Sequence, residues 1–173
     1  MLVTISGLPG SGTTTAGRLL ADALGWEFQS SGELFRNMAG ARGVSLAEFG
    51  ALAESDERID HELDARAVAL MRTGTGLVME GRLAGWMAFR NRFASMRVWL
   101  ESDSTTRARR VADRDGGSAA EQQAVMAARE ASEAQRYRDY YNIEIGSREP
   151  YSLVINSAAL APKAIVAHIR EAL

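Results

Sequence analysis

The stretch that decides the fold class is GLPGSGTTT, which comprises Gly7, Leu8, Pro9, Gly10, Ser11, Gly12, Thr13, Thr14 and Thr15. It matches the phosphate-binding pattern G-x-x-x-x-G-K-[ST] at Gly7, Gly12 and Thr14, but Thr13 stands in the position of the lysine. The apolar run before it is typical of a parallel strand buried on both faces, and residues 14–24 have the spacing of a helix that ends at Gly25. A loop between such a strand and helix directs backbone N–H groups at an anion. We therefore expect residues 7–15 to hold phosphate groups, with Thr14 in the position of a magnesium ligand.

Five short runs of β-branched and other apolar residues predict strands, and segments with helical spacing separate them. The predicted strands are Leu2–Ser6, Trp26–Gln29, Gly76–Glu80, Met96–Leu100 and Ser152–Asn156. Strands that alternate with helices favour a parallel sheet covered by helices on both faces. Together with the phosphate loop, this pattern predicts an α/β fold of the P-loop NTPase class with a five-stranded parallel sheet.

The other segments predict helices that extend from this core. Residues 30–64 have the pattern of two or three helices, residues 54–72 that of a helix returning to the sheet, and residues 105–141 that of two helices joined at Gly116-Gly117-Ser118. A last helix is expected over residues 162–173, with a proline in its first turn. We expect a single domain, residues 1–173, with the following parts: a core of residues 1–29, 74–104 and 142–173, a helical insertion of residues 30–73, and a helical lid of residues 105–141.

The composition excludes several classes of protein. The 173 residues are 46% hydrophobic and 24% charged, and no apolar run approaches the roughly 20 residues of a membrane helix. The chain begins MLVTISG, without the basic region of a signal peptide, and it has no cysteine, so we expect a cytoplasmic protein. A net charge of -2 gives no general attraction to nucleic acid or to a membrane surface. Of the 20 basic residues only Lys163 is a lysine, so a cation that binds phosphate here is expected to be a guanidinium.

Two further motifs carry polar groups at positions where ligands bind. In SSGELFR, Ser31 and Gly32 offer donors at the start of a helix, and Arg36 lies about one turn further on; the same pattern also suits a plain helix cap followed by a surface arginine. In EGR, Glu80 ends a buried strand and is followed by Gly81 and Arg82. Ligands of open α/β sheets bind beside the carboxyl ends of the strands, which favours a ligand role for Glu80.

Six motifs together resemble a known family. GLPGSGTTT, SSGELFR, DERIDHELD, EGRLAGW, RARRVADRD and REASEAQRYRDYY stand in the order and at the spacings of the archaeal-type cytidylate kinases, a branch of the nucleoside monophosphate kinases. SSGELFR is also similar to the adenylate kinase segment that holds the acceptor nucleotide. EGR resembles the D-G-R of bacterial cytidylate kinases, and the sequence from Arg129 to Arg136 resembles their R-D-x-x-D-x-x-R, whose arginines belong to the lid region. The resemblance covers nearly the whole chain.

The resemblance implies ATP-dependent, in-line phosphorylation of CMP and dCMP, with Mg²⁺ bound to ATP. Residues 7–15 would bind the ATP phosphates and Thr14 the metal. The arginines expected to stabilise the transferring group are Arg36, Arg82, Arg107, Arg110, Arg129 and Arg136. The residues expected to bind the acceptor are Ser31, Gly32, Arg36, Asp60, Glu80, Gly81 and Arg82. We also expect a monomer with no nucleic-acid or membrane partner.

Thr13 raises the question of how the site works without the loop lysine. Our hypothesis is that guanidinium groups of the lid replace it, because arginines are dense in residues 107–138. For Arg109, Arg114 and Arg138 we expect exposed positions on helix surfaces instead.

Several alternatives stay open at this stage. Asp60 and Asp64 share a helix face, and either bind the amino group or the sugar of a pyrimidine nucleotide or form an exposed acidic surface. The acceptor could be another nucleoside monophosphate or a non-nucleotide alcohol. The loss of the lysine also suits a regulatory protein that binds nucleotide without catalysis.

Overall fold

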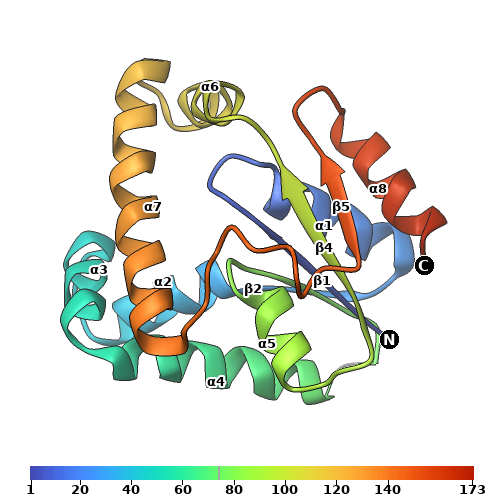
Figure 1. Ribbon diagram of the computed structural model, residues 1–173, viewed down its shortest axis with the longest axis horizontal. Coiled ribbons are helices and arrows are strands. Elements are labelled where there is room, and N and C mark those ends of the chain that lie inside the picture. Colours follow the sequence, from blue (N-terminus) through green and yellow to red (C-terminus); the bar gives the residue numbers. More distant parts are fainter. Residues whose placement is uncertain (74) are drawn as a thin grey trace.

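The described part of the chain, residues 1–73 and 75–173 of a computed structural model, contains one parallel sheet (Figure 1). Its strands are β1 (Leu2–Gly7), β2 (Glu27–Ser30), β3 (Leu77–Glu80), β4 (Ser95–Glu101) and β5 (Leu153–Asn156), in the order β2-β3-β1-β4-β5. All four strand pairs are parallel. The five predicted strands are confirmed, each within one residue at either end. Residue 74, where the core segment 74–104 was expected to begin, lies outside the described residues.

Helices cover both faces of the sheet, because alternate strand residues point to opposite sides. Val3 and Ile5 pack in one apolar cluster with α1 (Thr13–Leu24) and α8 (Pro162–Glu171). Leu2 belongs to a second cluster with α4 (Glu57–Thr73) and α5 (Ala84–Arg90). The sheet is therefore buried between two layers, as the continuous apolar character of residues 2–6 predicts.

Three helices connect β2 to β3: α2 (Ser31–Ala41), α3 (Leu46–Ser55) and α4. They have an apolar cluster of their own, in which Phe49 is fully buried. The predicted helix over residues 54–72 is wrong at its start, because Asp56 has an extended backbone and its carboxylate accepts the N–H of Arg58. The first residues of that prediction belong to the end of α3.

Two helices connect β4 to β5: α6 (Ser104–Asp115) and α7 (Ala119–Tyr141), and they confirm the predicted hairpin. Gly116 and Gly117 have φ of 88° and 82°, and Ser118 forms a capping box with Glu121 at the start of α7. In Figure 1, α7 descends along one side of the molecule towards α3 and α4. The contact with α3 is polar, since Tyr140 OH donates to the Ala53 carbonyl over 3.1 Å.

The short helix α5 is an element that the sequence pattern does not predict. It follows the EGR motif and packs its face of Ala84, Trp86 and Met87 on the sheet. Within the described residues, none of the helices has the length and apolar character needed to cross a membrane.

Candidate active site

The phosphate loop, residues 7–15, has the backbone geometry that its glycines predict. Gly10 and Gly12 have φ of 80° and 91°, in the left-handed region that favours glycine. At Gly7 a Cβ atom would lie 2.5 Å from Ser11 Oγ and 2.8 Å from Leu100 O, so a larger residue does not fit. The non-helical part of the loop ends at Gly12, residues 13–15 form the first turn of α1, and Gly12 has no side chain to cap the helix. The N–H groups of the first turn of α1 are thus left for an anion.

A buried serine after β5 braces this loop. Ser157 Oγ lies 2.8 Å from the carbonyl of Ser11 and 2.9 Å from that of Glu101, and shares its hydrogen between them. Ser11 Oγ in turn donates to the carbonyl of Leu8. The loop is therefore tied to the ends of β4 and β5. A lone serine after a strand gives no sequence signal for this role.

Thr13, in the lysine position of the phosphate-loop pattern, contacts a carboxylate. Its Oγ1 donates to Glu80 Oε1 over 2.9 Å, and Ser30 Oγ donates to Glu80 Oε2 over 2.6 Å. Glu80 is 8% exposed. The two hydroxyls satisfy one lone pair on each carboxylate oxygen and orient the group between the phosphate loop and α2.

The predicted acceptor-binding motifs meet at the start of α2. A Cβ atom at Gly81 would lie 2.4 Å from Ser31 Oγ, so glycine is required for this close approach. A Cβ atom at Gly32 would lie 3.6 Å from Arg36 Nη1, which places that guanidinium over the first turn of α2. Arg36 is exposed and forms no salt bridge within the described residues.

Arg82 is held by a carboxylate from α7. Its Nε donates to Glu133 Oε2 over 2.7 Å, and its Nη1 donates to the carbonyl of Gly7. Arg129, one turn before Glu133, donates to the other carboxylate oxygen over 2.8 Å. Burial alone would raise the pKa of Glu133, but the charges of Arg82 and Arg129 outweigh it and hold that pKa below its usual value. One carboxylate thus pairs with two of the predicted arginines, and the cluster keeps a net positive charge.

Arg107 and Arg110, on α6, bind backbone carbonyls near the loop. Arg107 is buried, donates from Nη1 to the carbonyl of Pro9 over 2.9 Å, and pairs with Glu130 of α7. Arg110 donates from Nη2 to the carbonyl of Ser157 over 2.6 Å. Both guanidiniums therefore brace the edge of the phosphate loop and the loop after β5.

Arg136 faces α4 and Asp60. Its Nη1 lies 3.5 Å from Asp60 Oδ2; the side chain of Asp60 is 4% exposed and that of Arg136 12%. Burial raises the pKa of Asp60, and the charge of Arg136 partly offsets this effect. Burial also raises the pKa of Asp64, one turn further along α4, to about 7. With Asp60 3% exposed, the alternative of an exposed acidic surface is wrong for this residue.

The predicted site residues therefore fall into three groups. Thr13, Glu80, Gly81, Ser31 and Arg82 lie together at the ends of β1 and β3, and Arg129 reaches Arg82 through Glu133. Arg107 and Arg110 bind the other side of the loop, and Arg136 lies with Asp60 between α4 and α7. Arg109, Arg114 and Arg138 are exposed, as expected.

Sequence reasoning missed the acidic partners Glu130 and Glu133, although their spacing in R-E-x-x-E-x-x-R is the signal that would have found them.

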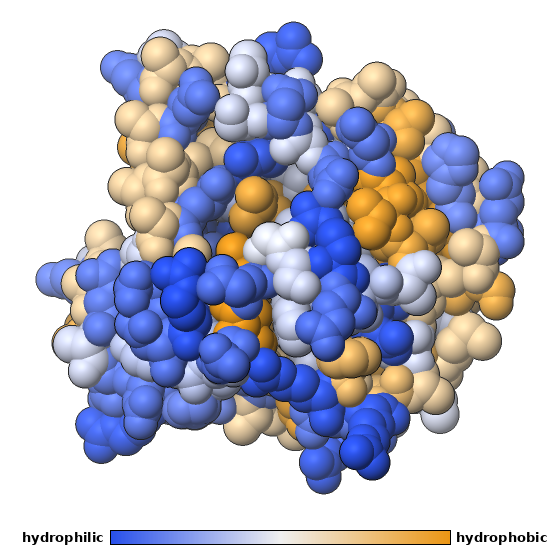
Figure 2. All heavy atoms as spheres, in the orientation of Figure 1, coloured by the Kyte–Doolittle hydropathy of each residue, from blue (hydrophilic) through white to orange (hydrophobic). Residues whose placement is uncertain are grey.

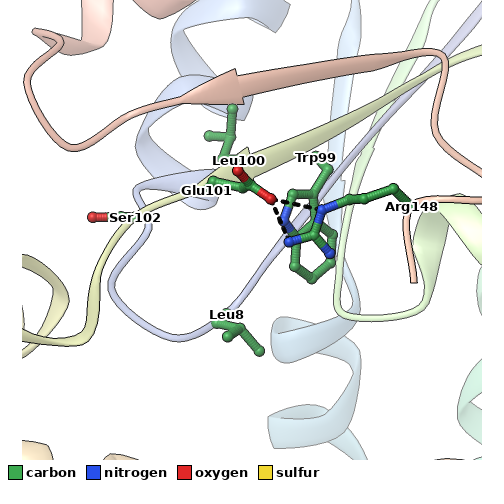
Figure 3. A pocket seen from close by; sticks show the side chains of 6 residues that line it. All are labelled: Leu8, Trp99, Leu100, Glu101, Ser102 and Arg148. Atoms are coloured by element: carbon green, nitrogen blue, oxygen red, sulfur yellow. Dashed lines mark hydrogen bonds and ion pairs between the residues drawn. The ribbon is translucent and has the colours of Figure 1, made fainter. Parts of the chain in front are cut away.

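A hollow of about 260 Å³ adjoins the phosphate loop at Leu8 (Figure 3). It is lined by Trp99, Leu100, Glu101, Ser102 and Arg148. Arg148 stacks over the Trp99 ring, with 4.3 Å between the guanidinium carbon and the ring centroid, and donates to Glu101 Oε1 over 2.8 and 2.5 Å. The charge of Arg148 is therefore already neutralised.

No group of three or more histidine or acidic side chains in the described residues could hold a metal ion by itself. The oxygen donors near the phosphate loop are the hydroxyl of Thr14, exposed in the first turn of α1, and the carboxylate of Glu80. One or two such donors suit a Mg²⁺ ion that nucleotide phosphates largely coordinate.

Comparison with known proteins gives consistent results. The model of the cytidylate kinase-like family matches residues 2–159. A cytidylate kinase of Halobacterium salinarum is 44% identical over 172 residues, which are 99% of this chain and 88% of that protein. A cytidylate kinase of Methanococcoides burtonii is 46% identical over 158 residues, which are 91% of this chain and 88% of that protein. A shikimate kinase structure from Bacteroides thetaiotaomicron aligns with a TM-score of 0.68 at 15% identity, covering 99% of this chain and 97% of that one, and shows that the fold is shared.

Proposed function

Because this chain belongs to the cytidylate kinase-like family, we propose that it transfers the γ-phosphoryl group of ATP to CMP and dCMP, with Mg²⁺ bound to the nucleotide. The observation that carries this proposal is the hydrogen-bonded link from Thr13 to Glu80 to Ser30, which joins a phosphate loop to a second site with cationic residues. A donor site and an acceptor site side by side are what phosphoryl transfer requires, because the enzyme positions two substrates in line.

The phosphate loop would bind the donor. Its backbone N–H groups and the start of α1 complement the negative charge of ATP phosphates. Thr14 and Glu80 offer the oxygen donors that fit Mg²⁺, Glu80 through a metal-bound water or directly. When bound, the metal neutralises charge on the phosphate oxygens and helps to orient them.

The acceptor phosphate would bind between α2 and the end of β3. Ser31 and Gly32 offer donors at the helix start, and Arg36 adds a guanidinium that is in no salt bridge within the described residues. Arg82, two residues after the end of β3, contributes a second guanidinium beside the phosphate loop, where its Nη1 donates to the carbonyl of Gly7. Two guanidiniums beside one position favour a phosphorylated acceptor over a neutral alcohol.

The bound phosphates would replace Glu133 as the partner of Arg82 and Arg129. This carboxylate pairs with Arg82 and Arg129, and a phosphoryl group offers the same guanidiniums oxygen acceptors of higher charge. Arg107, Arg110, Arg129 and Arg136 would then act in the lid, and arginines at such positions can contribute roughly 10³ to 10⁵ in rate. This contribution is large enough to offset the lysine that Thr13 replaces.

Closure of two segments would protect the reaction from water. The helices of residues 30–73 and 105–141 flank the carboxyl ends of the strands, and Figure 2 shows a recess between α7 and these strand ends. Closing both segments over the nucleotides would exclude water, which otherwise competes with CMP for the phosphoryl group.

An assay of ADP release across CMP, dCMP, UMP, AMP and shikimate tests the proposal. We expect turnover with CMP and dCMP, and little with the other acceptors. Turnover with shikimate alone would reject a nucleotide acceptor. ATP binding by calorimetry without turnover on any acceptor would indicate the regulatory alternative.

A further inference from the structure

We propose that Tyr151, on the loop before β5, is a positioning residue for Arg82. It acts through the start of α5, which it holds against β1 by contacts with Ser6 and Gly85. This inference rests on the proposed function, because it concerns a guanidinium that would bind the acceptor phosphate there.

Arg82 lies in a short turn whose geometry depends on where α5 begins. β3 ends at Glu80, and the N–H of Ala84, the first residue of α5, donates to the carbonyl of Gly81 over 3.2 Å. Arg82 is therefore only two residues from the helix. A shift of α5 on the sheet would move its guanidinium away from the carbonyl of Gly7, to which it donates.

The first turn of α5 is capped by a residue of another element. Leu83, the residue before the helix, has no polar side chain that could cap it. Instead, the N–H of Gly85 donates to Oγ of Ser6 on β1 over 3.2 Å, although the two residues are 79 positions apart in the chain. Ser6 is fully buried, so water does not compete for this bond. The start of α5, and with it Arg82, is thus tied to the strand that leads into the phosphate loop.

Tyr151 contacts both partners of this capping bond. At Gly85 a Cβ atom would overlap Cε1 of the Tyr151 ring and lie 3.0 Å from its Cδ1, so the ring lies directly on the backbone of α5. Burial raises the pKa of Tyr151 to about 12. A hydrogen bond with Ser6 acts against this effect, and so do the charges of Arg148 and Arg82. The hydroxyl of Tyr151 therefore lies beside Ser6 and within range of the guanidinium that it would position.

The Tyr151 ring is itself held in place by β4. Its centroid lies 5.0 Å from that of the Trp99 ring, and Trp99 is 2% exposed. On one side of Tyr151 in the chain, Arg148 stacks over Trp99 and pairs with Glu101 (Figure 3). On the other side, the N–H of Ser152 donates to a carbonyl of β4 over 2.9 Å. The loop is anchored before and after Tyr151, so the ring keeps a fixed place against α5.

A positioning role differs from plain packing in one measurable respect. A positioning residue affects the reaction only through Arg82, so its substitution has no further effect once that guanidinium is gone. A residue that only stabilises the fold lowers activity by the same factor with or without Arg82. A double-mutant cycle measures this difference.

The test is kcat/KM for CMP in Tyr151→Phe, made in the wild type and in Arg82→Ala. The variant keeps the ring on Gly85 and removes only the hydroxyl, so we expect a fall of about 5- to 20-fold in the wild-type background. In Arg82→Ala the same substitution should change the value by less than about 2-fold. Ser147→Ala is the control on the same loop, because Ser147 Oγ has only the Glu149 N–H as a partner within the described residues. We expect the wild-type value for that control.

Two further measurements cover variants that cannot be assayed in this way. If Arg82→Ala turns over too slowly, the Kd of CMP, measured by calorimetry, replaces kcat/KM, because Arg36 remains to bind the acceptor. If Tyr151→Phe does not fold, Ser6→Ala removes the acceptor of the Gly85 N–H and should show the same dependence on Arg82. Wild-type values in the folded variant, or equal losses in both backgrounds, overturn the inference. A wild-type protein that phosphorylates no monophosphate would instead reject the proposed function.

Discussion

Thr13 Oγ1 donates a hydrogen bond to Glu80 Oε1 over 2.9 Å, so the residue in the lysine position of the phosphate loop points at the end of β3. Both residues are buried, with Ser30 on the other carboxylate oxygen. The Thr13 side chain therefore orients Glu80, and the phosphate loop contributes backbone N–H groups without an ammonium. The carboxylate of Glu80 therefore links the two sides of the proposed cleft, which are the phosphate loop and the start of α2.

Thr13→Val should lower kcat and stability together. The variant keeps the shape of the side chain but leaves Glu80 Oε1 without its donor, which costs about 1–3 kcal/mol in the free energy of unfolding. Thr13→Ser keeps the hydroxyl and is the matched control, expected within about 1 kcal/mol of the wild type. Denaturant unfolding and steady-state kinetics measure both effects. Wild-type kcat and stability in Thr13→Val would show that the hydrogen bond has no role.

Arg129→Ala and Arg136→Ala should each lower kcat, by as much as about 10³-fold if these guanidiniums stabilise the transferring group. Arg138→Ala is the control on the same helix, because Arg138 is exposed and pairs only with the exposed Glu144 among its described salt bridges. We expect wild-type kcat for that control. If both test variants turned over CMP at the wild-type rate, the idea that lid arginines replace the loop lysine would be lost.

Glu133→Gln should destabilise the protein more than a surface change would. The substitution leaves the guanidinium of Arg82, whose side chain is 15% exposed, without its carboxylate, and removing one partner of a buried pair typically costs about 3–5 kcal/mol. Glu144→Gln breaks the exposed pair with Arg138 and should cost at most about 1 kcal/mol. Unfolding in urea compares the two, and equal losses would contradict a structural role for the Glu133 pair.

The sequence predicts the sheet better than the site. Strands are short apolar runs between turn residues, so all five could be placed, whereas the start of α4 depends on a capping contact of Asp56 and α5 has only seven residues. Gly7, Gly12 and Glu80 could be predicted from spacing, because Gly7 and Glu80 end strands and Gly12 directly precedes α1. The R-E-x-x-E-x-x-R spacing points to Glu133, but its pairing with Arg82, 51 residues away in the chain, depends on how α7 packs. The same holds for Ser157, which reaches Ser11 only through the pairing of β5 with β4.

Asp64 should make stability fall as the pH rises from about 4 to about 7. Burial raises its pKa from 3.8 to about 7, so the folded protein holds a proton that the unfolded chain releases in this range. The free energy of unfolding therefore falls as the pH rises through this window, by a few kcal/mol at most in total. The groups that act on Asp64 are Asp60 on α4 and the hydroxyl of Tyr141 on α7, and both remain in Asp64→Asn.

Melting temperatures of the wild type and Asp64→Asn between pH 4.5 and about 8 therefore isolate the titration of this one carboxyl. The melting temperature of the wild type should fall relative to that of the variant as the pH rises to about 7. Above that pH the two curves should run parallel, because Asp64 is then ionised in both the folded and the unfolded state. Parallel curves across the whole range would mean that Asp64 is ionised in the folded protein throughout it, and that burial does not raise its pKa.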